Sequence, residues 1–294
     1  MSALSESIGR RFTVTSEVKP PRGPDASKMM DELDAMRGLR KLLALNVIDS
    51  PSARLLMSSL GASIILKQNG IEPIFQMVCR DRNLLALESD LLSASAFGIE
   101  NVLALTGDHP SRGASDHPNV RPIYDLDSTS LIRTISMMNK GRDPAGVELN
   151  AKTSFFVGGA VNPNVRPLEP EVLKMARKTE AGASFFQSQA VFDAKCLQDF
   201  ASKMDELVGD LRPKVLVGII PLASEKMVAF LNRLPGMKVP DAVASRVLKA
   251  KDPQTEGVAV SLELIDEIKK LGFGGVHIMP VGRINSLAAI VREL

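Results

Sequence analysis

The chain has 294 residues, of which 45% are hydrophobic and 24% charged, and its 36 basic and 34 acidic side chains give a net charge of +2. A chain of this length can bury a large core, and it lacks an apolar run of the roughly 18 residues that a membrane span requires. The near-neutral charge, without a long basic block, disfavours nucleic acid as a partner.

The N-terminus and the cysteines indicate the compartment and limit the metal chemistry. No apolar signal sequence follows Met1, so we expect a cytoplasmic protein. The two cysteines, Cys79 and Cys196, are too few for a disulfide framework, a thiolate zinc site or a four-thiolate iron–sulfur cluster. Electrons from such a cluster would have to come from another subunit.

Eight apolar or alternating segments of strand length succeed one another, and each is followed by a segment of helical pattern. The predicted strands cover residues 12–18, 44–49, 73–79, 101–105, 154–160, 183–189, 214–221 and 275–280. The predicted helices cover residues 25–42, 52–68, 84–97, 128–140, 169–180, 194–208, 224–234, 254–271 and 284–293. Apolar strands that alternate with amphipathic helices are typical of a parallel sheet covered on both faces.

Eight such units in a chain of this length predict a (β/α)8 TIM barrel that forms a single domain over residues 1–294. A doubly wound open sheet is the alternative architecture. The first predicted strand is followed by Pro-Pro-Arg-Gly-Pro at residues 20–24, however, and lacks the Gly-x-Gly-x-x-Gly turn of a dinucleotide-binding open sheet.

Carboxylates and amides stand where the predicted strands end, which in a barrel is the end that binds ligands and performs chemistry. A carboxylate such as Asp108 can accept two parallel N–H bonds from a pterin-like edge, and Gln189 can both donate and accept there. A turn at Gly107 with Asp108 as a helix cap is the plainer interpretation. The residues expected near this end of the barrel are Glu17, Asp49, Gln76, Thr106, Asp108, Gly158, Gln187, Gln189 and Met279.

Glu17 is the candidate general acid, because burial beside Val18 and two prolines would favour its protonated form. The alternative is a salt bridge from Glu17 to Lys19 or Arg22. The histidines at positions 109, 117 and 277 lack the mutual spacing of metal ligands, so we predict no metal site and interpret each as a loop donor or a satisfied core residue. The Gly/Ser/Pro/His-rich segment 110–122 is longer than most connections of this kind, which indicates a functional loop.

Six motifs, in order along nearly the whole chain, resemble the methylenetetrahydrofolate reductase family, and most closely its short bacterial form. Each motif is weak alone, but the six together in register are specific. They are Ser16-Glu-Val-Lys-Pro-Pro21, Cys79-Arg-Asp-Arg-Asn83, Leu105-Thr-Gly-Asp108, Gly159-Ala-Val-Asn-Pro163, Arg177-Lys-Thr-Glu-Ala-Gly-Ala183 and Phe186-Gln-Ser-Gln-Ala-Val-Phe-Asp193.

The resemblance implies a flavin-bearing barrel that passes hydride from a reduced nucleotide to 5,10-methylenetetrahydrofolate and forms 5-methyltetrahydrofolate. It places Glu17 as the proton donor, Asp108 between flavin and pterin, Gln189 against the folate and Arg283 near the folate tail. The cofactor-binding residues that it implies are Asp49, Ser50, Gln76, Thr106, Gly107, Asp108, Tyr124, Asp125, Gly158, Asn162 and Lys178.

Several flavin-lining positions depart from better-known members of the family, so the resemblance implies FAD with FMN as the alternative. Gln76 and Asn162 stand where histidine is common, Thr106 where arginine is common and Gly158 where tyrosine is common. The electron donor is NADH, NADPH or a partner subunit carrying iron–sulfur clusters or zinc, and we expect an oligomer.

Two alternative functions come from other classes. A barrel that has lost its flavin could serve as a binding or scaffold subunit in one-carbon metabolism. A Schiff-base aldolase would need a lysine at a strand end, where Lys19 is the nearest candidate.

Overall fold

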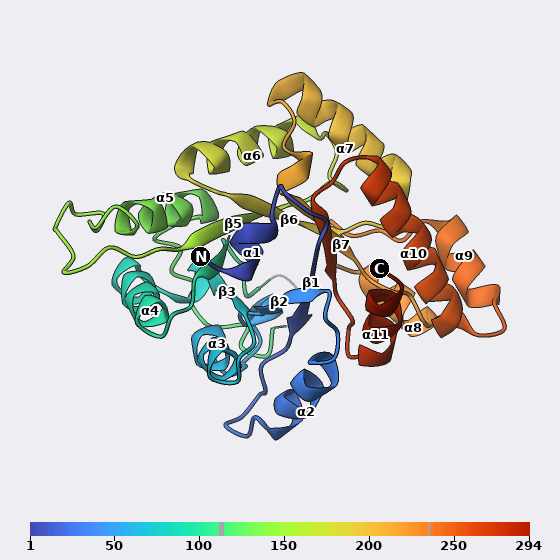
Figure 1. Ribbon diagram of the computed structural model, residues 1–294, viewed down its shortest axis with the longest axis horizontal. Helices are drawn as coiled ribbons and strands as arrows, with labels where there is room; N and C mark the ends of the chain where they lie inside the picture. The colour runs from blue at the N-terminus through green and yellow to red at the C-terminus, as the bar shows by residue number, and fades with distance from the viewer. Residues whose placement is uncertain (112–114, 235) are drawn as a thin grey trace.

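The computed structural model describes residues 1–111, 115–234 and 236–294. Eight parallel strands close a barrel in the order of the sequence, with the last strand paired to the first (Figure 1). The strands are β1 Thr13–Val18, β2 Leu42–Val47, β3 Pro73–Val78, β4 Asn101–Leu105, β5 Phe156–Val161, β6 Phe185–Ala190, β7 Val215–Ile219 and β8 Gly275–Ile278. The predicted (β/α)8 barrel is therefore confirmed.

Helices surround the barrel, and most of them cover its outer face. They are α1 Ala3–Ser7, α2 Ser27–Met36, α3 Ser59–Gln68, α4 Leu84–Ala96, α5 Ser128–Met138, α6 Glu169–Ala181, α7 Ala194–Leu207, α8 Glu225–Leu231, α9 Asp241–Lys249, α10 Pro253–Lys270 and α11 Ile284–Glu293. Short 3-10 turns lie at η1 Pro51–Ala53, η2 Cys79–Asp81 and η3 Arg212–Lys214. Among the described residues, no helix is long and apolar enough to cross a membrane.

Two predicted helices have different boundaries in the structure, and one helix of the insert was not predicted. The helix expected from Ser52 begins at Ser59, because the Ser58 side chain caps it and residues 51–53 form a separate 3-10 turn. The helix expected to reach Leu42 ends at Met36, and Leu42 already belongs to β2. Part of the polar insert after residue 234 forms α9, which was not predicted.

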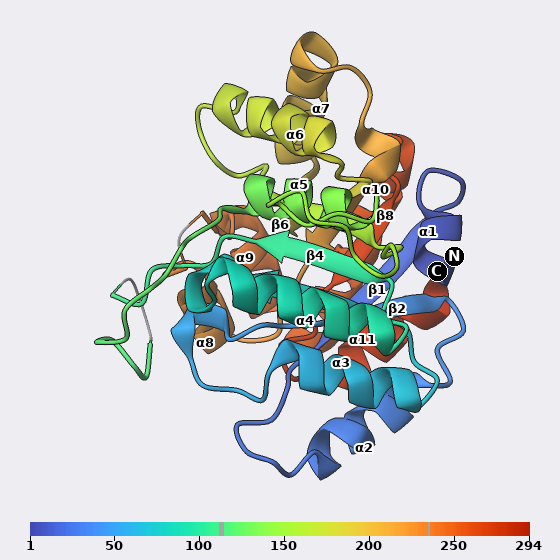
Figure 2. The same cartoon turned by 90° about the vertical axis from the view of Figure 1, so that its left-hand side faces the viewer.

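The helix α1, also not predicted, covers the N-terminal end of the barrel. In Figure 1 it crosses the barrel axis in front of the strands, and in Figure 2 the arrow of β4 points away from it. Leu4 and Ile8 of this segment pack against Ile74, Leu103 and Phe185, whose side chains fill the barrel interior. The barrel is thus closed at one end by apolar packing.

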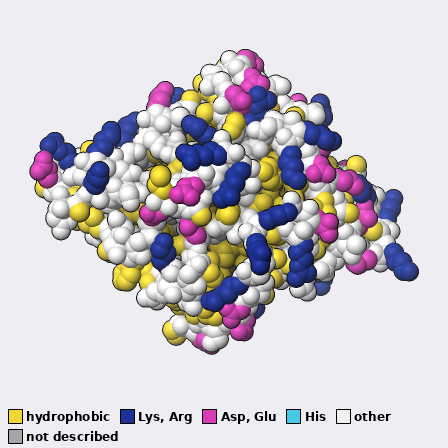
Figure 3. All heavy atoms as spheres, in the orientation of Figure 1, with side chains coloured by type: hydrophobic (Ala, Val, Ile, Leu, Met, Phe, Trp, Pro, Cys, Tyr) yellow, Lys and Arg dark blue, Asp and Glu magenta, His cyan; other side chains and the backbone are white. Residues whose placement is uncertain are grey.

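Lys and Arg side chains are frequent on the face that α1 covers (Figure 3). Several helices end there with basic residues in the last turn, among them Lys67 of α3 and Lys269 and Lys270 of α10. The partial negative charge of a helix C-terminus stabilises cations placed there. The helix C-termini therefore account for part of the basic character of this face.

Candidate active site

Glu17 lies inside the barrel near the C-terminal end of β1. Alternation along the strand turns Val14 and Val18 outward into the core shared with the helices, so Thr15 and Glu17 face the interior. The Glu17 side chain keeps 25% of its exposure. It is therefore accessible from the open end of the barrel.

His277 lies on β8, the strand paired with β1, and its side chain faces Glu17. Its Nε2 lies 3.7 Å from Glu17 Oε2, and its Nδ1 lies 3.0 Å from Thr15 Oγ1. The imidazole is fully buried, yet Nε2 has no hydrogen-bond partner among the described residues. A small movement of Glu17 would bring the two groups into hydrogen-bond range.

These contacts correct two interpretations made from the sequence. Glu17 forms no ion pair with Arg22, which pairs instead with Asp116. His277 is a core residue, as expected, but it is not satisfied. Sequence alternation in 275–280 could have indicated that His277 shares the inward face of a strand next to Glu17.

An amide pair bridges the barrel interior beside Glu17. Asn46 of β2 is the register partner of Glu17, and its Nδ2 donates to Gln187 Oε1 of β6 at 2.7 Å. Asn46 is fully buried, and its Oδ1 has no partner among the described residues. Gln189, two residues beyond Gln187, shares the inward face and is half-buried. The bridge therefore forms a polar layer across the interior at the level of Glu17.

The turn after β4 depends on Gly107. Its φ is +89°, and a Cβ there would lie 2.3 Å from Val78 Cγ1, so no other residue fits without a shift. The Tyr124 hydroxyl donates to Gly107 O at 3.1 Å, and Thr106 Oγ1 accepts from the backbone of Ser128 at 3.0 Å. Asp108 follows this turn with its side chain exposed. The described parts of this connection, residues 106–111 and 115–127, extend beyond this end of the barrel, as Figure 2 shows.

Two predicted cofactor residues take part in a buried network at the ends of β2 and β3. Asp49 accepts from Val78 N at 3.0 Å and from Arg82 Nη1 at 2.7 Å, and Arg82 also binds Asp90 at 2.8 Å. The Ser50 carbonyl accepts from Arg80 Nη2 at 3.0 Å. These contacts brace the loops around the site and leave the Asp49 carboxylate 3% exposed.

Of the other predicted site residues, some hydrogen-bond to neighbouring loops and some remain partly exposed to solvent. Gln76 is half-buried on the inward face of β3, and Asp125 accepts from Leu84 N at 3.0 Å. Asn162 Nδ2 donates to Gly236 O at 3.1 Å. The half-buried Arg283 precedes α11, and its Nη1 donates to Gln254 Oε1 at 3.3 Å.

Gly158 and Lys178 both make close contacts with other residues of the chain. A Cβ on Gly158 would lie 2.3 Å from the Phe185 ring, which stacks on Phe156. Lys178 Nζ donates to Ala160 O at 2.5 Å, and burial lowers the pKa of this lysine. A contact of either residue with a cofactor remains a prediction.

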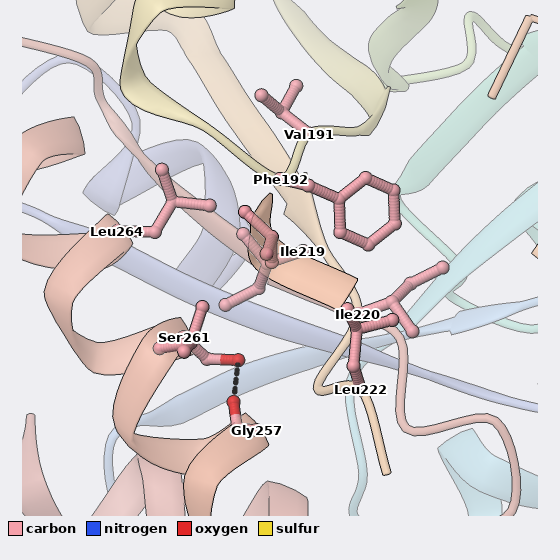
Figure 4. Close-up of a pocket in the computed structure, with 10 residues that line it drawn as sticks. Val191, Phe192, Ile219, Ile220, Leu222, Gly257, Ser261 and Leu264 are labelled. Atoms are coloured by element: carbon pink, nitrogen blue, oxygen red, sulfur yellow. Dashed lines mark hydrogen bonds between the residues drawn. The ribbon is translucent and has the colours of Figure 1, made fainter. Parts of the chain in front are cut away.

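A small cavity lies between α10 and the C-terminal ends of β6 and β7. Val191, Phe192, Ile219 and Leu264 of α10 are among the residues that line it, and its volume is about 10 Å³ (Figure 4). The hydroxyl of Ser261, which also lines it, donates to Gly257 O at 2.7 Å. The cavity has room for about one water molecule and is a packing defect.

The chemistry of the site is that of acids and amides. No group of three His, Cys, Asp or Glu side chains able to hold a metal ion occurs in the part of the chain that the structure describes.

The predicted segment 110–122 includes residues 112–114, which lie outside the described residues. The fold and these side chains together define a (β/α)8 barrel protein with a cluster of polar groups, the candidate site, at the C-terminal ends of its strands.

Comparison with known proteins identifies the family. The model of the family described as methylenetetrahydrofolate reductase matches residues 4–294. The chain belongs to the methylenetetrahydrofolate reductase family, so the resemblance of its motifs is confirmed.

Relatives from animals and bacteria carry the same family name. The probable methylenetetrahydrofolate reductase (NADPH) of Caenorhabditis elegans is 24% identical over 246 residues, which are 81% of this chain and 34% of that protein. The chain thus spans about a third of this longer relative. The 5,10-methylenetetrahydrofolate reductase of Pectobacterium carotovorum subsp. carotovorum is 19% identical over 300 residues, 99% of this chain and 94% of that protein.

Among solved structures, a similar barrel is found in an uncharacterized protein from Clostridium thermocellum, described as binding two copies of 5-methyl-5,6,7,8-tetrahydrofolic acid. It aligns with a TM-score of 0.70 and 15% identity over 99% of this chain and 97% of that one. A 2,3-dimethylmalate lyase aligns with a TM-score of 0.53 and 12% identity over 99% of this chain and 84% of that one. These likenesses show the fold.

Proposed function

We propose that the protein catalyses flavin-dependent reduction of 5,10-methylenetetrahydrofolate to 5-methyltetrahydrofolate, with Glu17 as the proton donor. The observation that carries the proposal is the pair of Glu17 and His277 inside the open end of the barrel, 3.7 Å apart. The family, the names of its relatives and the folate bound by the Clostridium thermocellum protein support the same substrate.

Reduction requires the imidazolidine ring of the substrate to open, and the nitrogen that leaves carbon must gain a proton. Glu17 is placed to give that proton, because its side chain remains partly exposed at the open end. His277 lies behind it, and its unpartnered Nε2 can hold a proton for Glu17 or accept one from it. Thr15 fixes the imidazole ring through Nδ1.

Asp108 and Gln189 supply the groups that a pterin needs. The Asp108 carboxylate can accept paired N–H bonds, and the Gln189 amide can donate and accept along the same edge. Gln189 Oε1 is already oriented by Ala190 N at 3.1 Å, which leaves its NH2 group for a ligand. Arg283, at the end of the barrel where β8 leads into α11, is assigned to the carboxylates of the folate tail.

The residues around β3 and β4 fit a flavin by their chemistry. Gln76, Thr106 and the backbone of the Gly107 turn offer the amide, hydroxyl and N–H groups that a flavin ring requires, with Tyr124 supporting the turn. FAD is the flavin that we propose, with FMN as the alternative. Bound there, the flavin supplies hydride transfer, and NADH, NADPH or a partner subunit with iron–sulfur clusters or zinc supplies the electrons.

An absorption spectrum of the purified protein, before and after addition of FAD or FMN, tests the flavin. We expect a yellow protein, or one that becomes yellow on addition of flavin. A protein that binds neither flavin but binds folate would favour the alternative of a binding or scaffold subunit.

The Glu17→Gln variant tests the acid. It keeps the shape of the side chain but has no proton to give, so we expect folate reduction to fall roughly 10²- to 10⁴-fold while reduction of the flavin by the electron donor continues. Stopped-flow spectra separate the two half-reactions. Loss of both would show that Glu17 has a structural role instead.

A further inference from the structure

Arg80 is the largest fully buried side chain among the described residues, and the proposed reaction gives it no role. It is 1% exposed and lies in η2, directly after β3. Arginine side chains are almost never fully buried unless they are paired. The partners of this guanidinium therefore indicate what it does.

All three nitrogen atoms of the Arg80 guanidinium donate hydrogen bonds. Nε and Nη2 donate to the Asp81 carboxylate at 2.7 and 2.5 Å, which pairs the buried charge. Nη1 donates to the backbone carbonyl of Asp108 at 3.2 Å, and Nη2 also donates to that of Ser50 at 3.0 Å. Ser50 follows β2 and Asp108 follows β4, the two strands paired with β3. One side chain thus joins the loops after both neighbouring strands.

The backbone of Arg80 also holds the turn that carries Asp108. Arg80 N donates to Thr106 O at 3.1 Å, and Arg80 O accepts from Ile123 N at 2.8 Å. A Cβ placed on Gly107 would lie 3.1 Å from Arg80 Cβ, so the turn lies directly against this residue. These contacts leave the turn little freedom to move.

The loop on the other side of Arg80 has a strained backbone. Three residues in it that are not glycine have positive φ values, namely Ser50 at +41°, Ser52 at +54° and Ala53 at +55°. Such conformations persist where the surrounding contacts fix them, and they are common at ligand sites. Arg80 supplies a contact of this kind at Ser50 O, and Asp116 holds the far end of the loop by accepting from Leu55 N at 3.1 Å.

We propose that Arg80 is a positioning residue that fixes Asp108 and Ser50 relative to each other. This inference rests on the proposed function, in which Asp108 binds the pterin, and on the family resemblance, which implies Ser50 as a flavin contact. A guanidinium suits this task because its donors are fixed in one plane and point in several directions. A lysine would have a single nitrogen atom to share among the Asp81 carboxylate and the two carbonyl groups.

Folate binding by the Arg80→Lys variant tests the inference. The variant keeps the positive charge beside Asp81 but loses the planar set of donors. We expect the Kd of 5-methyltetrahydrofolate, measured by calorimetry, to rise about tenfold. Leu216→Ala is the matched control, because it removes apolar contacts at the other end of the barrel interior and should leave this Kd unchanged. A role of Arg80 in stability alone would leave the Kd unchanged in both variants.

Hydrogen exchange measured by mass spectrometry shows whether one residue holds both loops. In Arg80→Lys we expect the amides of residues 50–55 and 106–111 to exchange faster together, while β4 stays as protected as in the wild type. Tyr124→Phe, which removes the hydroxyl that donates to Gly107 O, is the matched variant. It should increase exchange in residues 106–111 and leave residues 50–55 unchanged.

A second variant keeps the test decisive if Arg80→Lys does not fold. The Asp81 side chain is 36% exposed, so Asp81→Asn introduces no buried cavity. It removes the negative charge that orients the guanidinium and should raise the Kd of the folate several-fold.

An unchanged Kd in Arg80→Lys and Asp81→Asn, or faster exchange in only one of the two loops of Arg80→Lys, would overturn the inference and leave the proposed reduction intact. Failure of the wild-type chain to bind 5-methyltetrahydrofolate would contradict the proposed function, and hydrogen exchange would then decide whether Arg80 joins the two loops.

Discussion

The two ends of the barrel interior are built from opposite kinds of side chain. At the N-terminal end Leu4, Leu103 and Leu216 belong to an apolar cluster with Phe185, and all are buried. Towards the C-terminal end Glu17, Asn46 and His277 face the same interior, and the last two have buried polar atoms without partners among the described residues.

The difference separates stability from function. Apolar side chains at one end gain free energy from burial, roughly 1.5–3 kcal/mol each. Each unpartnered polar atom at the other end costs about 1–3 kcal/mol in the ligand-free chain. A ligand or a reaction that uses these groups would explain why they are retained, so we propose that the polar end is the functional end.

The largest expected effect on stability is at the apolar end. Leu216→Ala should lower the free energy of unfolding by about 2–5 kcal/mol, because it leaves a cavity in the barrel interior. Denaturant unfolding measures the loss, and kcat should remain that of the wild type. A fall in kcat without a loss of stability would contradict the division between the two ends.

His277→Asn should instead lower kcat and leave stability nearly unchanged. It removes the imidazole behind Glu17, and we expect kcat to fall about 10- to 100-fold with little change in stability or in KM. A fall in stability without a fall in kcat would show that His277 only packs the barrel interior. Thr15→Ser, which keeps the hydroxyl beside Nδ1, is the control and should retain the kcat of the wild type.

Asn46→Leu tests the polar layer itself. The single substitution leaves Gln187 Oε1 without its donor and should destabilise the chain by about 1–3 kcal/mol. The double variant Asn46→Leu with Gln187→Met should regain most of that stability, because both partners are then apolar. Denaturant unfolding of the three proteins tests this, and a double variant no more stable than the single would show that the bridge itself is required.

The smallest effect is expected at Cys79, which directly follows β3 and begins the 3-10 turn η2. Burial raises the pKa of the Cys79 thiol to about 12 from 9.0, so at pH 8 the native chain should react with a thiol reagent far more slowly than the denatured chain. The raised pKa also contributes stability that is present below pH 9 and lost as the pH rises towards 12. Rapid labelling of Cys79 in the native chain would contradict its burial.

Much of the fold follows from local pattern. The strands that become β3, β4 and β8 are predicted from apolar runs with turn residues behind them, and eight repeats of strand and helix indicate the closed barrel. The helix α1 has five residues, too few for a helical period to be recognised, and its place depends on Leu4 entering a barrel end formed by distant strands.

The candidate site, like the fold, could be predicted only in part from local sequence pattern. The sequence by itself determined the barrel, its family and the positions of Glu17, Asp108 and Gln189 at strand ends, because strand length and motif order are properties of neighbouring residues. Only the tertiary structure decided that His277 lies behind Glu17 and that Asn46 reaches Gln187 across the interior. Those contacts join residues 260 and 141 positions apart, and closure of the sheet brings them together.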